Sequence, residues 1–247
     1  MLITVITVCR DSAAVIADCV RSVAAQDYPH VEHLIVDGAS TDGTVVAFLS
    51  VGSDRVRWLS EPDEGLYFAL NKGLALASGE VIGFLHADDV FADSGVLGRL
   101  AAAFADPGCE ACYGDLEYVS GDDPARVVRF WRAGGFGPGA FASGWMPPHP
   151  TFYARTSVYR DYGGFDTRFS IGADWDILFR LFEVKRIRAV YLPGVMVRMR
   201  LGGISNRSLK NIISNNLQCL RSFRKYGRRI SLGYFAAKLR HRLAQFR

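Results

Sequence analysis

An apolar run meets two adjacent carboxylates in the stretch Val81-Ile82-Gly83-Phe84-Leu85-His86-Ala87-Asp88-Asp89. The first five residues are typical of a buried strand. In open α/β sheets, ligands bind at the carboxyl ends of the strands. Two like charges this close repel each other and are costly to remove from water, and a divalent cation, which takes oxygen ligands, would stabilise them. We therefore expect a cation here, placed to hold a diphosphate.

The residues before this stretch alternate between strand and helix patterns. The predicted strands are 2–8, 33–36 and 55–59. The predicted helices are one capped by Asp11 or Ser12, then 45–49 and 64–77. Alternating units of this kind predict an α/β fold with a Rossmann-like, mainly parallel central sheet and flanking helices. Asp37 ends the second strand, so it should face the same crevice as Asp88.

The residues after this stretch continue the pattern and then change character. The predicted elements are a helix over 94–104, a strand over 110–113, a helix over 173–184 and two basic amphipathic helices over 209–226 and 232–245. Residues 134–150 are rich in Gly and Pro and predict a long loop, a type of segment that is often functional in compact domains. Asp174 and Asp176 fall in the first turn of their helix.

Length and composition limit the class of protein. The chain has 247 residues, 49% of them apolar, which fits one large α/β domain or a domain with an appendage. No apolar run reaches the length of a membrane span, and the first strand lacks the features of a signal peptide, so we expect a cytoplasmic protein. Five cysteines without a secretion signal argue against disulfides. Cys109 and Cys112 are expected to be small buried residues, because no second pair accompanies them.

The charge is unevenly distributed. Residues 201–247 hold eleven of the 29 Lys and Arg and no Asp or Glu, which leaves 18 basic against 25 acidic residues in the rest of the chain. Apolar residues are interleaved with the basic ones at Leu209, Ile212, Ile213, Leu217, Leu220 and Phe223. This composition suits a helix lying on an anionic membrane surface through residues 205–247, and packing on the main domain suits it equally. Nucleic acid is disfavoured, because no nucleic-acid motif accompanies the charge.

Several motifs, in order over residues 1–200, together resemble family 2 glycosyltransferases. The motifs are the opening strand, Val36-Asp37-Gly38-Ala39-Ser40-Thr41-Asp42-Gly43-Thr44, Glu61-Pro62-Asp63-Glu64-Gly65, Asn71-Lys72-Gly73, His86-Ala87-Asp88-Asp89, Gly163-Gly164-Phe165-Asp166 and Gly172-Ala173-Asp174-Trp175-Asp176. The fifth resembles the DXD metal motif of that family, and the last two resemble its acceptor-side segment.

This resemblance implies the GT-A fold, with a nucleotide-sugar-binding half over 1–115, an acceptor half over 116–200 and a basic helical tail over 201–247. It implies an inverting glycosyltransferase that uses a nucleotide-sugar, most often a UDP-sugar, with Mn²⁺ or Mg²⁺ as cofactor. The acceptor would be a glycan or a lipid-linked molecule in polysaccharide or glycolipid synthesis. The positions expected to bind the donor are Val8, Asp11, Asp37, Asp63, Lys72, Ala87 and Asp88.

Three side chains are candidate metal ligands. Asp88 is expected to contact the metal, with Asp89 next to it or just behind it, and a helix cap is the alternative role for both. His149, between two prolines, could reach the metal or the diphosphate from the opposite side, although a lone histidine is more often structural. His86 occupies the place of the first acidic residue of the DXD motif, which puts the strength or identity of the metal in question.

Two further carboxylates have candidate roles in the reaction. Asp37 can accept a strong hydrogen bond from a base N–H, or it can hold an Asx-turn with Gly38, which stands where the family usually has a second Asp. Asp174 is the candidate base, because sugar transfer needs a carboxylate to take the proton of the acceptor hydroxyl. A helix N-terminus favours its ionised form, and simple helix capping is the alternative. Asp176 should point elsewhere on the helix.

Two other kinds of function are compatible with these motifs. A metal-dependent nucleotidyltransferase on a related α/β fold would use the same metal carboxylates, but it would not need the acceptor-side acidic segment as a base. A non-catalytic module that binds a sugar nucleotide or a membrane would bind the nucleotide without hydrolysing or transferring it. A dehydrogenase is excluded, because no GxGxxG follows the first strand.

Overall fold

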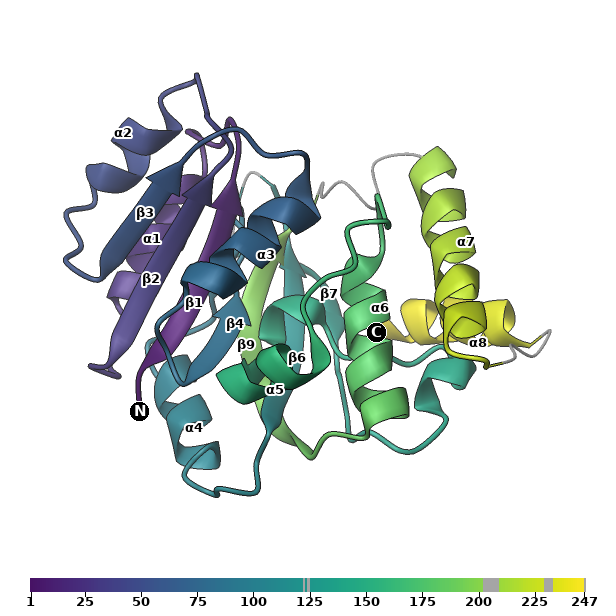
Figure 1. Ribbon diagram of the computed structural model, residues 1–247. Helices are drawn as coiled ribbons and strands as arrows, with labels where there is room; N and C mark the ends of the chain where they lie inside the picture. The colour runs from purple at the N-terminus through teal and green to yellow at the C-terminus, as the bar shows by residue number, and fades with distance from the viewer. Residues whose placement is uncertain (122, 124, 202–208, 229–232, 247) are drawn as a thin grey trace.

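One nine-stranded sheet runs through the molecule (Figure 1). This computed structural model describes residues 1–121, 123, 125–201, 209–228 and 233–246. The strands are β1 (Ile3–Cys9), β2 (Val31–Asp37), β3 (Val56–Ser60), β4 (Val81–Phe84), β5 (Val90–Phe91), β6 (Ala111–Val119), β7 (Val127–Trp131), β8 (Tyr153–Arg155) and β9 (Ala189–Arg200). They lie in the order β3-β2-β1-β4-β8-β6-β9-β5, and β7 pairs with β6.

The amino-terminal half of the sheet is parallel, as the alternating pattern predicts. Strand β1 pairs in parallel with β2 and β4, and β2 pairs in parallel with β3. Beyond β4 the sheet is mixed, because β8 is antiparallel to both β4 and β6, whereas β6 and β9 are parallel. The mainly parallel sheet expected from the sequence therefore describes the first half, and the acceptor half adds a mixed extension to it.

Helices cover both faces of the sheet (Figure 1). They are α1 (Ile16–Ala24), α2 (Thr44–Leu49), α3 (Leu66–Leu76), α4 (Val96–Ala103), α5 (Thr156–Tyr162), α6 (Ala173–Phe179), α7 (Leu209–Lys225) and α8 (Tyr234–Leu243). Shorter helical segments are η1 (Ala140–Ser143), η2 (His149–Thr151), η3 (Arg180–Lys185) and η5 (Ala244–Phe246). Among the described residues, no helix combines the length and apolar character needed to cross a bilayer.

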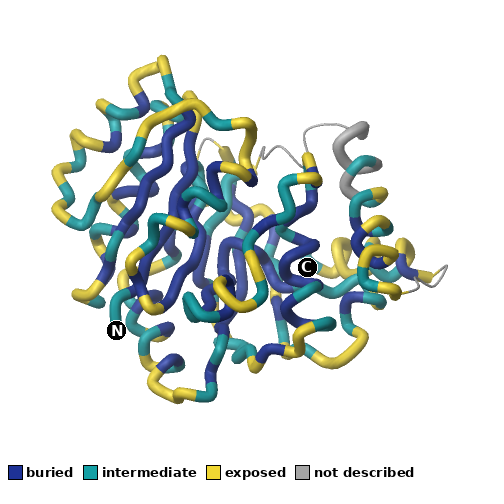
Figure 2. Tube along the Cα trace, viewed as in Figure 1, coloured by how far each residue is buried: buried dark blue, intermediate teal, exposed yellow. Residues whose placement is uncertain are grey.

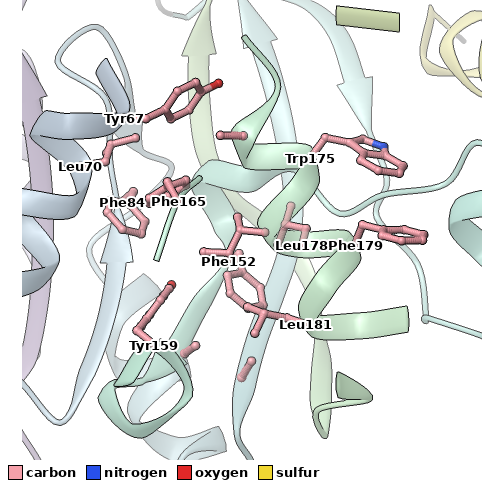
Figure 3. Close-up of a cluster of buried hydrophobic side chains, with 14 of the residues drawn as sticks. Tyr67, Leu70, Phe84, Phe152, Tyr159, Phe165, Trp175, Leu178, Phe179 and Leu181 are labelled. Atoms are coloured by element: carbon pink, nitrogen blue, oxygen red, sulfur yellow. The ribbon is translucent and has the colours of Figure 1, made fainter. Parts of the chain in front are cut away.

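Alternation along β1 explains how the layers form. Ile6 and Val8 belong to a core shared with α3, α5 and α6, whereas Ile3 and Val5 point to the opposite face and pack with α1 and α4. Strands β1, β2, β4 and β6 are accordingly buried along most of their length (Figure 2). Figure 3 shows the first core, where Phe84 of β4 lies 5.2 Å from Phe165 between ring centroids. This packing fixes the end of β4 against the acceptor half.

Gly83 lets β8 approach β4 closely. A Cβ atom at this position would lie only 2.1 Å from the Tyr153 ring, which packs directly on the glycine. The single glycine in the apolar run that precedes the carboxylates therefore marks a close backbone approach. It joins the parallel half of the sheet to the acceptor half.

The described part of the basic tail packs on the acceptor half. Phe223 of α7 is 2% exposed, and its ring lies 4.7 Å from that of Phe179 and 5.0 Å from that of Trp175. Leu217, on another face of α7, is 59% exposed. The side chains expected at Leu209, Ile212 and Ile213 lie outside the described residues. Packing on the domain, one of the two roles left open by the sequence, therefore holds for the carboxyl-terminal part of α7.

We expect Phe223→Ala to lower the free energy of unfolding by about 3–5 kcal/mol, because it opens a cavity among the buried rings of α6 and α7. Urea unfolding followed by circular dichroism measures this loss. Leu217→Ala is the matched control, and as a surface change it should stay within about 0.5 kcal/mol of the parent. Equal stability of the two variants would mean that the tail is not part of the core.

Candidate active site

The carboxyl ends of the first four strands meet at one edge of the sheet. In the parallel registers, Cys9 at the end of β1 lies opposite Asp37, and Asp37 lies opposite Ser60 at the end of β3. The segment after β4 begins beside Ile6, because the Leu85 amide donates to the Ile6 carbonyl at 3.0 Å. Asp37 and the residues that follow Leu85 therefore share the edge where ligands bind in such sheets.

His86 lies within electrostatic range of the two carboxylates expected to carry the chemistry. Burial lowers the pKa of His86, and the negative charges of Asp88 and Asp174 act on the same ring in the opposite direction. Asp88 follows β4 and is partly exposed, and Asp174 lies in the first turn of α6 and is also partly exposed. Two carboxylates that are 86 residues apart in the sequence therefore act on one ring.

Asp174 is held in place by the start of α6. Gly172, with a φ of +86°, forms the residue before the helix, and its amide donates to the Tyr67 hydroxyl at 2.8 Å. This left-handed backbone suits glycine. Burial raises the pKa of Asp174, and backbone N–H groups of the first turn oppose the rise. A carboxyl with a raised pKa binds a proton more readily than an ordinary one, which suits a general base.

His149 is enclosed by aromatic rings. It is 5% exposed and stacks on Phe84 with ring centroids 5.4 Å apart, while Phe165 meets it edge-on at 5.5 Å. The His86 ring lies 6.2 Å away. Burial lowers the pKa of His149 to about 3, so the imidazole is neutral. A neutral imidazole is the form that binds metals, and its enclosure is equally suited to holding the position of His86.

Asp88 and Asp89 occupy different environments. Asp89 is fully buried, and in the described part of the chain neither of its carboxylate oxygens accepts a hydrogen bond of normal geometry. Burial, and then the charge of Asp88, raise the pKa of Asp89 well above the usual range. Asp88 is the partly exposed member of the pair. Asp88 can therefore reach a ligand directly, whereas Asp89 lies behind it.

Asp37 is buried and already holds hydrogen-bond donors. Its carboxylate accepts from the Ser60 hydroxyl at 2.6 Å, from the Ser40 amide at 3.0 Å and from the Ser40 hydroxyl. Burial would raise the pKa of Asp37, but these hydrogen bonds outweigh it and the pKa is lowered. Asp37 is 0% exposed, so a base N–H can reach its carboxylate only if Ser40 moves.

The loops after β1 and β2 are tied to each other. The Thr41 amide donates to the Asp11 carboxylate at 2.9 Å, and the Asp11 amide donates to the Ser40 hydroxyl at 2.8 Å. Asp11 has a φ of +48°, an uncommon conformation for a residue other than glycine. Asp42 accepts from the Thr44 amide at 3.0 Å, which holds the turn before α2. Asp11 thus lies in a loop of left-handed backbone that is anchored to the loop after β2.

Lys72 is occupied by two carboxylates. Its ammonium lies 2.6 Å from Asp63 and 2.6 Å from Glu61. Burial lowers the pKa of Lys72, but the two ion pairs outweigh it and raise the pKa overall. Two other positions expected to bind the donor, Val8 and Ala87, are buried at 6% and 7% exposure. Their side chains belong to buried apolar clusters.

Lys238 of α8 also lies near Asp174, a neighbour that the sequence did not indicate. Its charge lowers the pKa of Asp174, against the larger effect of burial. Its ammonium donates to the side chain of Asn216 at 2.9 Å, and its backbone lies against Gly144. The charge of α8 therefore reaches the start of α6. Sixty-four residues separate Asp174 from Lys238, and no motif in the sequence connects them.

Asp176 points away from Asp174, as expected. It is fully buried and binds the ammonium of Lys225 at 2.8 Å and the Tyr226 hydroxyl at 3.2 Å. A hollow of about 360 Å³ lies on this side of α7, lined by Asp166, Arg168, Phe169, Arg221, Arg224 and Lys225. Neither Asp88 nor Asp174 lines this hollow. The acidic edge and the hollow are thus separate features.

The donor atoms at this edge fit a divalent cation that is bound partly by protein side chains and partly by the phosphates of a substrate. Among the described residues, no three His, Cys, Asp or Glu side chains converge closely enough to enclose an ion. Mg²⁺ and similar ions are usually held by one or two carboxylates together with substrate phosphates, so a complete protein cage is not required. Asp88 supplies an accessible carboxylate, His86 supplies an imidazole within its electrostatic range, and the His149 ring lies 6.2 Å from that of His86.

A partly parallel sheet with acidic loops at its carboxyl edge, faced by an acidic helix start, is the arrangement of the GT-A glycosyltransferases. A mannosyltransferase from Pyrobaculum calidifontis, solved with GDP-Man and Mn²⁺, has a TM-score of 0.66 at 23% identity, over 98% of this chain and 70% of its own. The 1–349 fragment of S. aureus TarS with UDP has a TM-score of 0.65 at 17% identity, over 96% and 68%. This chain spans 43% of the length of the longer S. aureus TarS chain.

The chain belongs to glycosyl transferase family 2, whose sequence profile matches residues 4–162. An uncharacterised glycosyltransferase of Mycobacterium tuberculosis is 29% identical over 245 residues, which cover 96% of this chain and 90% of that protein. A PGL/p-HBAD biosynthesis glycosyltransferase of M. tuberculosis is 30% identical over 198 residues, which cover 78% of this chain and 75% of that protein. The family resemblance inferred from the motifs is confirmed.

Proposed function

We propose that this protein is an inverting glycosyltransferase that moves a sugar from a UDP-sugar to an acceptor hydroxyl in polysaccharide or glycolipid synthesis. The observation that carries the proposal is that the charges of both Asp88, after β4, and Asp174, at the start of α6, act on His86 at the carboxyl edge of the parallel strands. In this proposal Asp88 serves the diphosphate and Asp174 serves the acceptor. Nucleotidyl transfer would leave Asp174 without a role.

Asp174 acts as the general base in this proposal. It takes the proton of the acceptor hydroxyl while the oxygen attacks the anomeric carbon from the side opposite the departing diphosphate. The new bond to the acceptor forms as the bond to the nucleoside diphosphate breaks, which inverts the anomeric configuration. The start of α6 fixes the carboxylate through Gly172 and Tyr67, and much of the rate enhancement comes from holding the two reactants in line.

Asp88 would hold the cofactor, Mn²⁺ or Mg²⁺, with Asp89 behind it and His149 as the candidate ligand on the side opposite Asp88. When bound, this ion offsets the negative charge that grows on the departing diphosphate. Carboxylate oxygens suit both of these ions. On the nucleotide side, Asp37 bonds the base, and Asp11, Asp63, Lys72, Val8 and Ala87 surround the nucleoside and the phosphates.

The acceptor is a glycan or a lipid-linked molecule at the cytoplasmic face of an anionic membrane. Support for this part comes from the PGL/p-HBAD biosynthesis glycosyltransferase among the relatives and from the basic residues that gather in 201–247. The acceptor half meets these residues directly, since α7 packs on α6.

The full chain, incubated with Mn²⁺ or Mg²⁺ and a panel of nucleotide-sugars, tests the proposal. We expect slow release of UDP from one UDP-sugar, dependent on the metal and abolished by EDTA, because water can replace a missing acceptor. Release of pyrophosphate from a nucleoside triphosphate would indicate nucleotidyl transfer instead. Binding of nucleotide-sugars without any hydrolysis or transfer to added glycan acceptors would contradict the enzymatic proposal.

A further inference from the structure

Helix α8 carries a stripe of large apolar side chains on its outer face. Phe235, Leu239 and Leu243 recur every four residues, so they lie on one face of the helix, and Phe246 of η5 extends the stripe. These four side chains are between 41% and 60% exposed. The helix lies at the edge of the molecule beside α7 (Figure 1), and most of its length is exposed (Figure 2).

The stripe continues onto the sheet through η5. The Arg129 guanidinium of β7 lies 5.6 Å from the centre of the Phe246 ring, so the end of the chain rests against this strand. Val127, on the same face of β7 as Arg129, is 46% exposed. This valine and the stripe border each other through η5, and we call them together the α8–β7 surface. A monomeric soluble protein seldom leaves this many large apolar side chains uncovered together.

Basic residues border this surface. Arg240, His241 and Arg242 are exposed on α8 between the apolar positions, and Arg228 is exposed after α7. The sequence places no acidic residue anywhere in 201–247. An apolar stripe flanked by arginines is the composition of a helix that lies in the interface of an anionic bilayer, with its apolar side chains in the acyl boundary and its cations at the phosphates.

A second face of α8 packs on the domain. Tyr234 is 1% exposed, its ring lies 5.6 Å from that of Phe223, and the Phe223 ring lies 5.0 Å from that of Trp175, the residue that follows Asp174. A surface that settles on the membrane through the outer face of α8 would therefore turn the start of α6 toward the lipid. An acceptor carried on a lipid could reach Asp174 without leaving the bilayer.

We propose that the α8–β7 surface docks this protein on an anionic lipid bilayer, with the acceptor side of the active site turned toward the membrane. The proposal rests on the proposed function only for the nature of the acceptor. A second copy of the chain is a less suitable occupant, because two identical basic borders would repel each other in a symmetric pair. A bilayer of anionic lipid can bury the apolar stripe among its acyl chains and pair its phosphates with the arginines.

Flotation of the full chain with vesicles tests this proposal. We expect the parent protein to bind vesicles of phosphatidylglycerol and phosphatidylcholine and to bind pure phosphatidylcholine weakly. Leu239→Glu with Leu243→Glu should weaken binding to the anionic vesicles by at least about tenfold. The variant loses two leucines that would enter the lipid, and it gains two negative charges that the anionic lipid repels. Arg240→Gln with Arg242→Gln should weaken binding to the anionic vesicles alone.

A matched control changes an exposed apolar pair on a distant helix. Val46→Glu with Leu49→Glu alters α2, whose side chains at these positions are 73% and 48% exposed, and should bind vesicles as the parent does. Metal-dependent donor hydrolysis is measured on every variant without vesicles. It shows whether the variant is folded and whether the proposed function holds, and it does not depend on membrane docking. The proposal is overturned if the α8 variants float as the parent does, if the parent floats with neither vesicle, or if light scattering shows a dimer that the α8 variants dissociate.

Discussion

Asp88→Ala abolishes metal-dependent donor binding, and donor hydrolysis falls by on the order of 1,000-fold or more, because the diphosphate loses the cation that offsets its growing charge. Asp88 is the partly exposed carboxylate after β4, and its neighbour Asp89 is buried behind it. Calorimetric titration of the variant with UDP, with and without Mn²⁺, measures the loss. The variant should still fold, because a partly exposed aspartate is not part of the core.

Two further variants make this result specific. Asp161→Ala removes an exposed carboxylate of α5 that pairs with its neighbour Arg160 at 2.8 Å, and the variant should bind donor as the parent does. Asp89→Asn tests the carboxyl behind Asp88, whose pKa burial raises, and a loss of metal affinity there would place Asp89 on the ion as well. Unchanged metal-dependent binding by Asp88→Ala would remove the proposed cation site.

The parallel half of the fold could be predicted because its signals are local. Strands β1 to β4 are apolar runs flanked by turn residues, and the helices between them carry apolar residues at helical spacing. Each element can therefore be predicted from its own sequence. Their order along the chain then sets the parallel topology and the shared edge of Asp37 and Asp88. Helix α1 begins at Ile16, later than expected, because Asp11 and Ser12 are used to tie the loop to Ser40 and Thr44.

The acceptor half was harder to predict for physical reasons. Strand β8 has three residues, and its place between β4 and β6 depends on the absence of a side chain at Gly83. Strand β9 contains Pro193 and Gly194, which interrupt its pattern where its register against β6 shifts. Both features depend on residues far away in the chain, and periodicity carries no information about them.

The sequence predicted which residues form the site better than it predicted their hydrogen-bond partners and neighbours. Asp88 and Asp174 were expected to share one cleft, and their common neighbour His86 fits that expectation. The engagement of Asp37 by Ser40 and Ser60 was not expected, since two serines in separate loops have no signature in the sequence. Lys238 was overlooked for the same reason, because its proximity to Asp174 exists only once α8 has packed on the domain.

Asp174→Asn keeps donor binding and loses transfer. The amide fits the same space at the start of α6 but cannot take a proton from the acceptor hydroxyl, so we expect kcat for transfer to fall by about 100- to 10,000-fold. The affinity for UDP with Mn²⁺ should stay within a few-fold of the parent, because the donor is held at Asp88. Steady-state transfer assays, together with UDP titration, measure the two quantities on the same sample.

The pH dependence of transfer separates a base from a structural aspartate. Burial raises the pKa of Asp174, so the proportion of deprotonated base declines, as pH falls, at a higher pH than for an ordinary carboxylate. The ordinary pKa of Asp is about 4. As the pH is lowered, the parent should therefore begin to lose transfer activity at a pH above this value. The residual transfer of Asp174→Asn should lack this acid limb, because the titrating group is gone. Full transfer by the variant, or an unchanged acid limb, would assign the proton to another group, and Asp174 would then only cap α6.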